Sequence, residues 1–143
     1  MTTAYEVSIR LGFWGDSLEP ETLIRALGLS PSFCDSKVKG EVLKRPNGTP
    51  SGSVAKTGRV IYNCDKELEK QWHSPVAQLE RIADVLRPLP QSFFSSNGVE
   101  EGELQISVYY NKNVPGEPDF FVPTDLVPLV VLHAIRIRLT VLP

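Results

Sequence analysis

The chain has few of the residues on which catalytic and metal sites are usually built. Its 143 residues include two cysteines, two histidines and one methionine. Cys34 and Cys64 form no CxxC pair and lie in no cluster with histidine, so the ligands of a structural zinc site are missing. We therefore expect no metal and no cofactor, and we expect both thiols to be reduced.

Long apolar runs and an excess of basic residues are absent as well. The longest apolar stretch, 126–135, is shorter than a bilayer span and contains Pro128 and His133. Residues 1–14 have no basic leader, which argues against a signal peptide and favours a cytoplasmic protein. The formal net charge is −2, which excludes a surface built throughout for nucleic acid or anionic lipid. We expect neither as a partner.

The chain does have clear apolar periodicity, of period two in some segments and of helical period in others. The predicted strands span 5–14, 38–43, 54–63, 103–110 and 135–141, and the predicted helices span 20–28, 74–86 and 124–133. Pro20 and Pro75 suit the first helical turn, and Ser74 and Thr124 suit the preceding cap position. The order is therefore β-α-β-β-α-β-α-β.

The polar face of each well-patterned strand indicates how the layers are arranged. A sheet covered by helices on both faces has continuous apolar strands, whereas these strands alternate. We therefore predict an α+β protein, a two-layer sandwich related to the ferredoxin-like fold, with a mostly antiparallel sheet and helices on one face only. The length fits a single domain over 1–143. The uncovered face, here called the open face, is the first candidate site.

Several short sequence elements together resemble a known family. They are the LxPExLxxxLGLxP helix at 18–31, Lys39-Gly40, Lys56-Thr57-Gly58 before a strand, and the closing helix and strand. This combination is similar to the mostly bacterial family catalogued as domain of unknown function 4279. The resemblance implies a small bacterial cytoplasmic protein and implies no enzyme activity. Proteins of this size and style include immunity proteins that neutralise cognate toxins.

A flexible basic hairpin at about 35–59 is the second candidate site. It has a net charge of +4 (six cations minus Asp35 and Glu41). The cations are Lys37, Lys39, Lys44, Arg45, Lys56 and Arg59. Such a patch suits phosphate, RNA or an acidic protein, although lysines also protect edge strands from aggregation. Aromatic residues are not interleaved with these cations, which disfavours nucleic acid. Ala55 stands where a P-loop needs glycine, which excludes that motif.

Strand alternation places a set of arginines and a tyrosine together on the open face. The set comprises Arg10, Arg59, Arg136, Arg138 and Tyr109, and the same alternation places Glu6, Glu103 and Gln105 on this face. Guanidinium groups on a rigid sheet can hold carboxylates or phosphates in a bidentate manner, and the alternative is a cross-strand charge ladder in water. If the face binds a partner, we expect charge reversal at Arg136 and Arg138 to abolish binding and to leave the melting temperature nearly unchanged.

These patterns favour binding over catalysis. No nucleophile motif or Cys/His signature accompanies His73 or His133, so we do not expect an enzyme. The leading hypothesis is a non-enzymatic binding protein of immunity type, monomeric or homodimeric, that engages a protein partner through the open face and the basic hairpin. One alternative is an enzyme or sensor for a small anionic ligand held by the open-face arginines. The other is a structural homodimer that pairs open faces.

Overall fold

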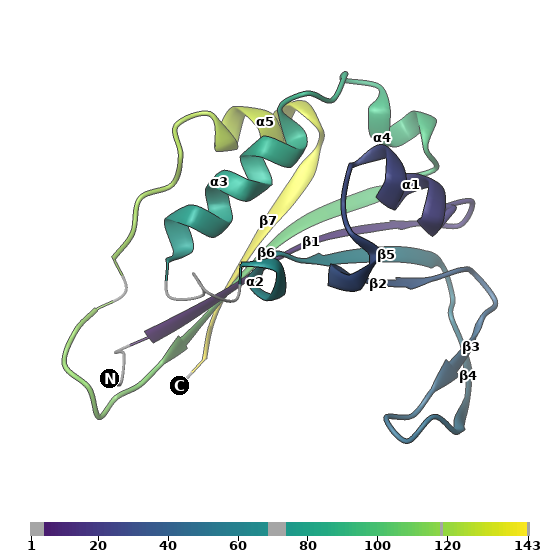
Figure 1. Ribbon diagram of the computed structural model, residues 1–143, viewed down its shortest axis with the longest axis horizontal. Coiled ribbons are helices and arrows are strands. Elements are labelled where there is room, and N and C mark those ends of the chain that lie inside the picture. The colour runs from purple at the N-terminus through teal and green to yellow at the C-terminus, as the bar shows by residue number, and fades with distance from the viewer. Residues whose placement is uncertain (1–4, 69–73, 118, 143) are drawn as a thin grey trace.

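The computed structural model describes residues 5–68, 74–117 and 119–142. A five-stranded sheet lies beneath a layer of helices, and a two-stranded arm extends from one end of the molecule (Figure 1). The α+β two-layer sandwich predicted from the sequence is confirmed. None of the helices in these three ranges has the length and apolarity that crossing a bilayer requires.

The strands and helices are as follows. The strands are β1 (Tyr5–Gly15), β2 (Cys34–Lys37), β3 (Val42–Lys44), β4 (Pro50–Val54), β5 (Gly58–Asn63), β6 (Glu101–Tyr110) and β7 (Ile135–Leu142). The helices are α1 (Pro20–Ala26), the 3-10 helix η1 (Pro31–Phe33), α2 (Cys64–Glu67), α3 (Pro75–Leu86), α4 (Phe93–Ser96) and α5 (Leu126–Leu132).

The main sheet has the strand order β2-β5-β1-β6-β7, with β1 at its centre. β1 is antiparallel to both β5 and β6, and β2 is antiparallel to β5. β7 runs parallel to β6, since α5 carries the chain back across the sheet between them. The sheet is therefore mostly antiparallel, as the sequence predicts.

The core lies between the sheet and the helices. Alternate residues of β1, from Val7 to Phe13, are buried and face the helical layer. α3 buries Leu79, Ile82 and Leu86 against them. This helix begins where the sequence predicts, and the Ser74 Oγ accepts a hydrogen bond from the Ala77 backbone N–H at 3.4 Å. The N-cap and the apolar stripe together fix α3 over the middle of the sheet.

The basic hairpin is built differently from the prediction. The sequence pattern gives one long return strand over 54–63, whereas the structure has β4 and β5 separated by residues 55–57. A Cβ on Gly58 would lie 2.8 Å from the Gly15 carbonyl oxygen, so β5 can begin beside the end of β1 only because this residue is glycine. β2 pairs with β5 inside the sheet, while β3 and β4 pair with each other outside it.

The C-terminal elements also depart from the prediction. The third helix starts at Leu126, and its N-cap is Asp125 instead of Thr124. The alternation in β7 predicts a fully buried apolar face, but only Ile135 among its apolar residues is buried. Helices cover the rest of the sheet and leave the helix-side face of β7 largely bare.

Candidate functional site

The structure places the predicted arginines and Tyr109 on the open face. Gln105 of β6 lies directly between Arg10 of β1 and Arg138 of β7. One row further along the strands, Arg136 lies opposite Glu103. Arg59 and Tyr109 are near opposite ends of the sheet, opposite Trp14 and Glu6 respectively. The central arginines therefore form one cluster, and the other two predicted residues lie at a distance from it. Lys37 is opposite Arg59 at the edge of the sheet.

A buried carboxylate pairs with two of the three central arginines. Glu103 is only 4% exposed although it lies on the open face. Its Oε1 lies 3.2 Å from the Arg138 Nε and accepts a hydrogen bond from the Gln105 Nε2 at 2.9 Å. Arg136 lies 3.7 Å from Glu103 and 3.6 Å from Glu101, which are longer ion pairs. Glu101 and Glu103 thus balance Arg136 and Arg138, and Arg10 is left as the central arginine without an ion pair among the described residues.

The remaining arginine, Arg59, lies opposite Trp14 at the β5 end of the open face. The Trp14 indole lies over Gly12, since a Cβ on that glycine would lie 2.5 Å from the Trp14 Cη2. Arg59, opposite Trp14, is partly buried, and its Nε has no hydrogen-bond partner among the described residues. The open-face set predicted from the sequence contains Arg59 and omits Trp14. The period-two pattern of β1 puts Trp14 on the same face as Arg10, and that signal was available.

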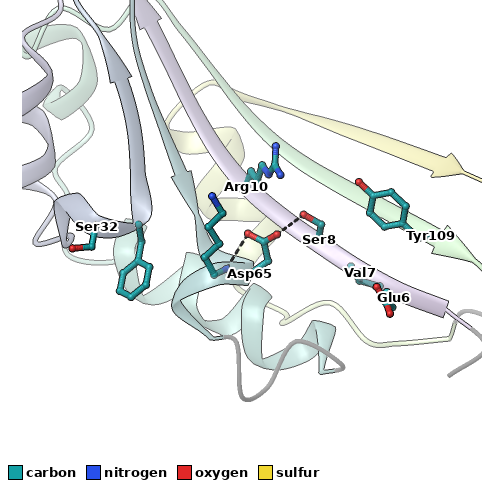
Figure 2. Close-up of a pocket in the computed structure, with 9 residues that line it drawn as sticks. Glu6, Val7, Ser8, Arg10, Ser32, Asp65 and Tyr109 are labelled. Atoms are coloured by element: carbon teal, nitrogen blue, oxygen red, sulfur yellow. Dashed lines mark hydrogen bonds between the residues drawn. The ribbon is translucent and has the colours of Figure 1, made fainter. Parts of the chain in front are cut away.

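A hollow of about 550 Å³, here called the notch, opens beside the first half of β1 (Figure 2). It exists because β5 ends at Asn63, opposite Arg10, while β1 continues to Tyr5 with only β6 beside it. The chain turns there into α2, which supplies Asp65 and Lys66 to the notch.

A buried polar cluster holds α2 in this position. The Tyr62 hydroxyl donates to the Glu67 Oε2 at 2.6 Å, and the Arg81 Nε donates to the Glu67 Oε1 at 2.8 Å. Burial, reinforced by this carboxylate, raises the pKa of Tyr62 far above its ordinary value, so the phenol stays neutral. The cluster joins β5, α2 and α3, and it is structural.

The charges in the notch are mixed. Arg10 and Lys66 contribute cations, while Asp65 and Glu6 contribute carboxylates. Asp65 is already engaged, because its Oδ2 accepts from the Ser8 hydroxyl at 2.7 Å and its Oδ1 accepts from the Lys66 backbone N–H at 3.0 Å (Figure 2). A small anion at Arg10 would therefore meet two carboxylates as well as two cations. Nothing in the sequence marked Asp65 or Lys66 for this place.

The basic hairpin forms a projecting arm, defined here as residues 38–57. β3 and β4 pair with each other and extend away from the sheet and helices (Figure 1). Backbone hydrogen bonds close its base, from Gly40 N–H to the Ala55 carbonyl and from Ala55 N–H to the Glu41 carbonyl, both at 2.8 Å. At the tip, the Asn47 Oδ1 accepts from the Thr49 hydroxyl at 2.7 Å. The arm is thus an ordered hairpin with its own hydrogen bonds.

The cations of the arm divide into paired and unpaired groups. At its base, Lys39 lies 3.2 Å from Asp16, and the adjoining Lys37 lies 3.0 Å from Glu41. These contacts lower the pKa of both carboxyl groups, mainly through the hydrogen bond from each lysine. The three remaining cations of the arm, Lys44, Arg45 and Lys56, are exposed and form no ion pair with the described residues.

The arm also exposes apolar side chains. Val42 lies directly opposite Val54, and together with Val38 these valines are 49 to 53% exposed. The prediction of a binding site in this segment rests on charge alone and does not include these valines. Three valines beside three unpaired cations give the arm both components of a protein-binding surface, an apolar centre and a charged rim.

The thiol and imidazole groups of the described residues that could serve as a nucleophile or a base lie in buried or half-buried positions. Both cysteines are free thiols, and burial raises the pKa of Cys34 to about 11 and that of Cys64 to about 12. His133 is buried at the end of α5, edge-on to Phe94, and its ring nitrogens have no hydrogen-bond partner in the described part of the chain. His73 lies outside the described residues.

Metal-binding geometry is likewise not found in residues 5–68, 74–117 and 119–142, where no group of three or more His, Cys, Asp or Glu residues could hold an ion. Comparisons of the chain with protein-family models, with curated proteins and with solved structures give no match. The resemblance to domain of unknown function 4279 therefore stays a prediction.

Proposed function

We propose that this chain is a non-enzymatic binding protein that uses the arm to engage an acidic surface on a protein partner. One observation carries the proposal: the arm combines three unpaired cations with three half-exposed valines and projects away from the core. A two-stranded hairpin contributes little stability by itself. The exposed valines have no role in the core, so their presence is explained by contact with another molecule.

Charge and composition indicate the kind of partner. The arm has a net charge of +3 (four cations minus one glutamate) in a chain of net charge −2. Such a local patch steers association with an acidic surface, whereas the valines supply apolar contact area. The arm contains no aromatic residue on which a base could stack, which favours protein over nucleic acid.

The finer role that we propose is that of a bacterial cytoplasmic protein of immunity type, whose partner is a cognate toxin. The family resemblance supports this role. The notch offers a second function, a sensor or enzyme site for a small anion at Arg10, but its two carboxylates make it the weaker candidate. Pairing of open faces in a homodimer is also less favoured, since Glu103 already pairs with Arg136 and Arg138 there.

The test is a comparison of two charge-reversal variants that change the net charge equally. In the first, Lys44→Glu and Arg45→Glu alter the tip of the arm. In the control, Arg25→Glu and Lys112→Glu alter exposed cations on the body that form no ion pair with described residues. Tagged protein captures partners from a lysate of the source organism, and bound protein and nucleic acid are identified by mass spectrometry and staining.

We expect wild type and the control to retain one stoichiometric acidic protein, and the arm variant to lose it. Capture should also weaken between about 0.1 M and about 1 M salt, because the Debye length falls over this range from about 10 Å to about 3 Å. Equal capture by the arm variant would refute the proposal. Capture of nucleic acid in place of a protein would refute the assigned partner class, and retention of the protein by the Arg10→Ala variant excludes the notch as the site.

A further inference from the structure

β7 is an unprotected sheet edge. It is the outermost strand of the sheet, and one side pairs in parallel with β6 over eight residues (Figure 1). No strand in the described part of the chain pairs with its other side. Alternate backbone N–H and C=O groups of β7 therefore point outward, in position to bond to another strand.

The helix-side face of β7 is apolar yet exposed. Ile135 is 7% exposed, whereas Ile137 is 49% exposed and Leu139 and Val141 are both 63% exposed. α5 delivers the chain into β7 and covers only its start, and α3 packs over β1 and α5. A strand of this pattern usually has one face in a core, so the three bare side chains point to cover by another molecule.

We propose that β7 pairs antiparallel with β7 of a second copy of this chain, around a twofold axis at Leu139. This inference is independent of the arm and of the proposed function. A twofold axis perpendicular to the sheet keeps the helical layers of both copies on the same side. The two five-stranded sheets then become one ten-stranded sheet, with a continuous apolar strip on the side of the sheet that carries the helices.

The charges of β7 select this register. Residues directly opposite each other in the two strands must project from the same face of the sheet. The twofold axis therefore lies beside a residue that is opposite its own copy, since a shift of one residue would place apolar side chains opposite polar ones. An axis at Arg138 would place Arg138 opposite its own copy, and an axis at Ile137 would place Arg136 opposite Arg138. Like charges in directly opposite positions are destabilising.

An axis at Leu139 avoids both repulsions. Arg138 then lies opposite Thr140, and Arg136 lies opposite Leu142. On the helix side Leu139 meets Leu139 of the second copy, and Ile137 meets Val141 twice. All three exposed apolar residues of each chain gain an apolar cross-strand neighbour in this register, whereas an axis at Thr140 shortens the overlap within β7 and leaves Ile137 without one.

One further feature fits a closed dimer. The opposite edge of the sheet, β2, has only four residues and carries Asp35 and Lys37, which makes it a poor template for continued growth.

The size of the contact sets the expected affinity. Standard interfaces bury about 800 Å² per partner. One strand edge and three apolar side chains per chain lie at the low end of this range, so we expect a dissociation constant on the order of micromolar. The mass should therefore rise from 15.9 kDa toward about twice that value within an accessible concentration series.

Sedimentation equilibrium of the full chain from about 1 to 200 µM tests the proposal over the micromolar range. The wild type should dimerise, and Leu139→Glu should weaken association by at least about tenfold, since it places two carboxylates on the axis. Val122→Glu is the matched control, because Val122 is an exposed apolar residue outside both β7 and the arm; it should associate like wild type. A wild type that stays monomeric, or a dimer unaffected by Leu139→Glu, overturns the proposal.

A cross-link tests the register without relying on a destabilising change. Residues directly opposite in an antiparallel pair have Cα atoms about 4.5 to 5.5 Å apart, within the range that a disulfide spans. In a Cys34→Ser background, Leu139→Cys should oxidise to a covalent dimer at least about tenfold faster than Val131→Cys, an exposed position on α5. Equal rates for the two variants would refute pairing at Leu139.

Discussion

Replacement of Arg138 by methionine should destabilise the protein, because it removes a partner of a buried charge. Glu103 is 4% exposed, and the Arg138 Nε lies 3.2 Å from its carboxylate. Methionine keeps much of the apolar stem of arginine and removes the guanidinium. The carboxylate would keep the Gln105 hydrogen bond and the longer contact with Arg136.

The magnitude follows from how exposed the pair is. Breaking a fully buried ion pair costs about 3 to 5 kcal/mol. Here the Arg138 side chain is 64% exposed, so water screens the pair and replaces part of the interaction. We therefore expect a loss of about 1 to 2 kcal/mol in the free energy of unfolding. For a chain of this length that is a fall of roughly 4 to 8 °C in melting temperature.

Urea denaturation followed by circular dichroism measures this loss, at about 1 µM protein so that association through β7 contributes little. Arg25→Met is the control, since Arg25 is exposed and unpaired within the described residues, and it should change stability by less than about 0.5 kcal/mol. In a Glu103→Gln background the loss should shrink to below about 0.5 kcal/mol, because no charge is then left without its partner.

The result that refutes this reasoning is a loss that is equal in the two backgrounds, or an Arg138→Met variant as stable as Arg25→Met. The same geometry changes one expectation drawn from the sequence. Charge reversal at Arg136 and Arg138 would place carboxylates against buried Glu103, so it should lower the melting temperature strongly instead of leaving it nearly unchanged. Such a variant cannot be used to test partner binding.

Two further predictions concern the thiols and the acid limb of stability. In the native protein both cysteines should react with Ellman's reagent at pH 8 at least about tenfold more slowly than glutathione, since burial raises the pKa of Cys34 to about 11 and that of Cys64 to about 12. Cys64 should be the slower of the two. Rapid reaction of Cys64 without denaturant would contradict this prediction. The Arg87 side chain donates hydrogen bonds to Asp125 and lowers the pKa of that carboxyl below its ordinary 3.8, so this contact stabilises the fold above pH 3.8 and the contribution is lost as the pH falls through the lowered value. Arg87→Gln should therefore be less stable than wild type in urea at pH 6, with a smaller difference near pH 2.5, and a difference that grows on acidification would refute the assignment.

Local sequence patterns predicted those strands and helices in which the spacing of apolar residues decides the buried face. The alternation in β1 and β6, and the stripe and cap of α3, each specify which face is buried, and the structure agrees. The break at residues 55–57 was not predictable in this way, since it arises where Gly58 meets Gly15 across the sheet. The exposure of Leu139 was equally hidden, because alternation does not say whether a helix lies above the strand.

The candidate site shows the same division. Period-two alternation correctly placed Arg10 and Arg138 on one face. It could not show that Glu103 is buried beside Arg138, because that contact depends on β7 running parallel to β6 in one register. The notch was also beyond sequence reasoning, since it forms only because β5 ends before β1 and the chain then turns back.

The independence of the arm has a consequence for how this protein can change over generations. The backbone hydrogen bonds of the arm lie within residues 38–57, and its Lys39–Asp16 ion pair with the body is exposed, so opening the arm need not open the core. A substitution at Val42 or Arg45 therefore changes the free energy of unfolding much less than a substitution at buried Leu11 or Leu79. Mutations that alter what the arm recognises would accumulate without loss of the fold, so a lineage could follow a changing partner by sequence drift in this hairpin alone.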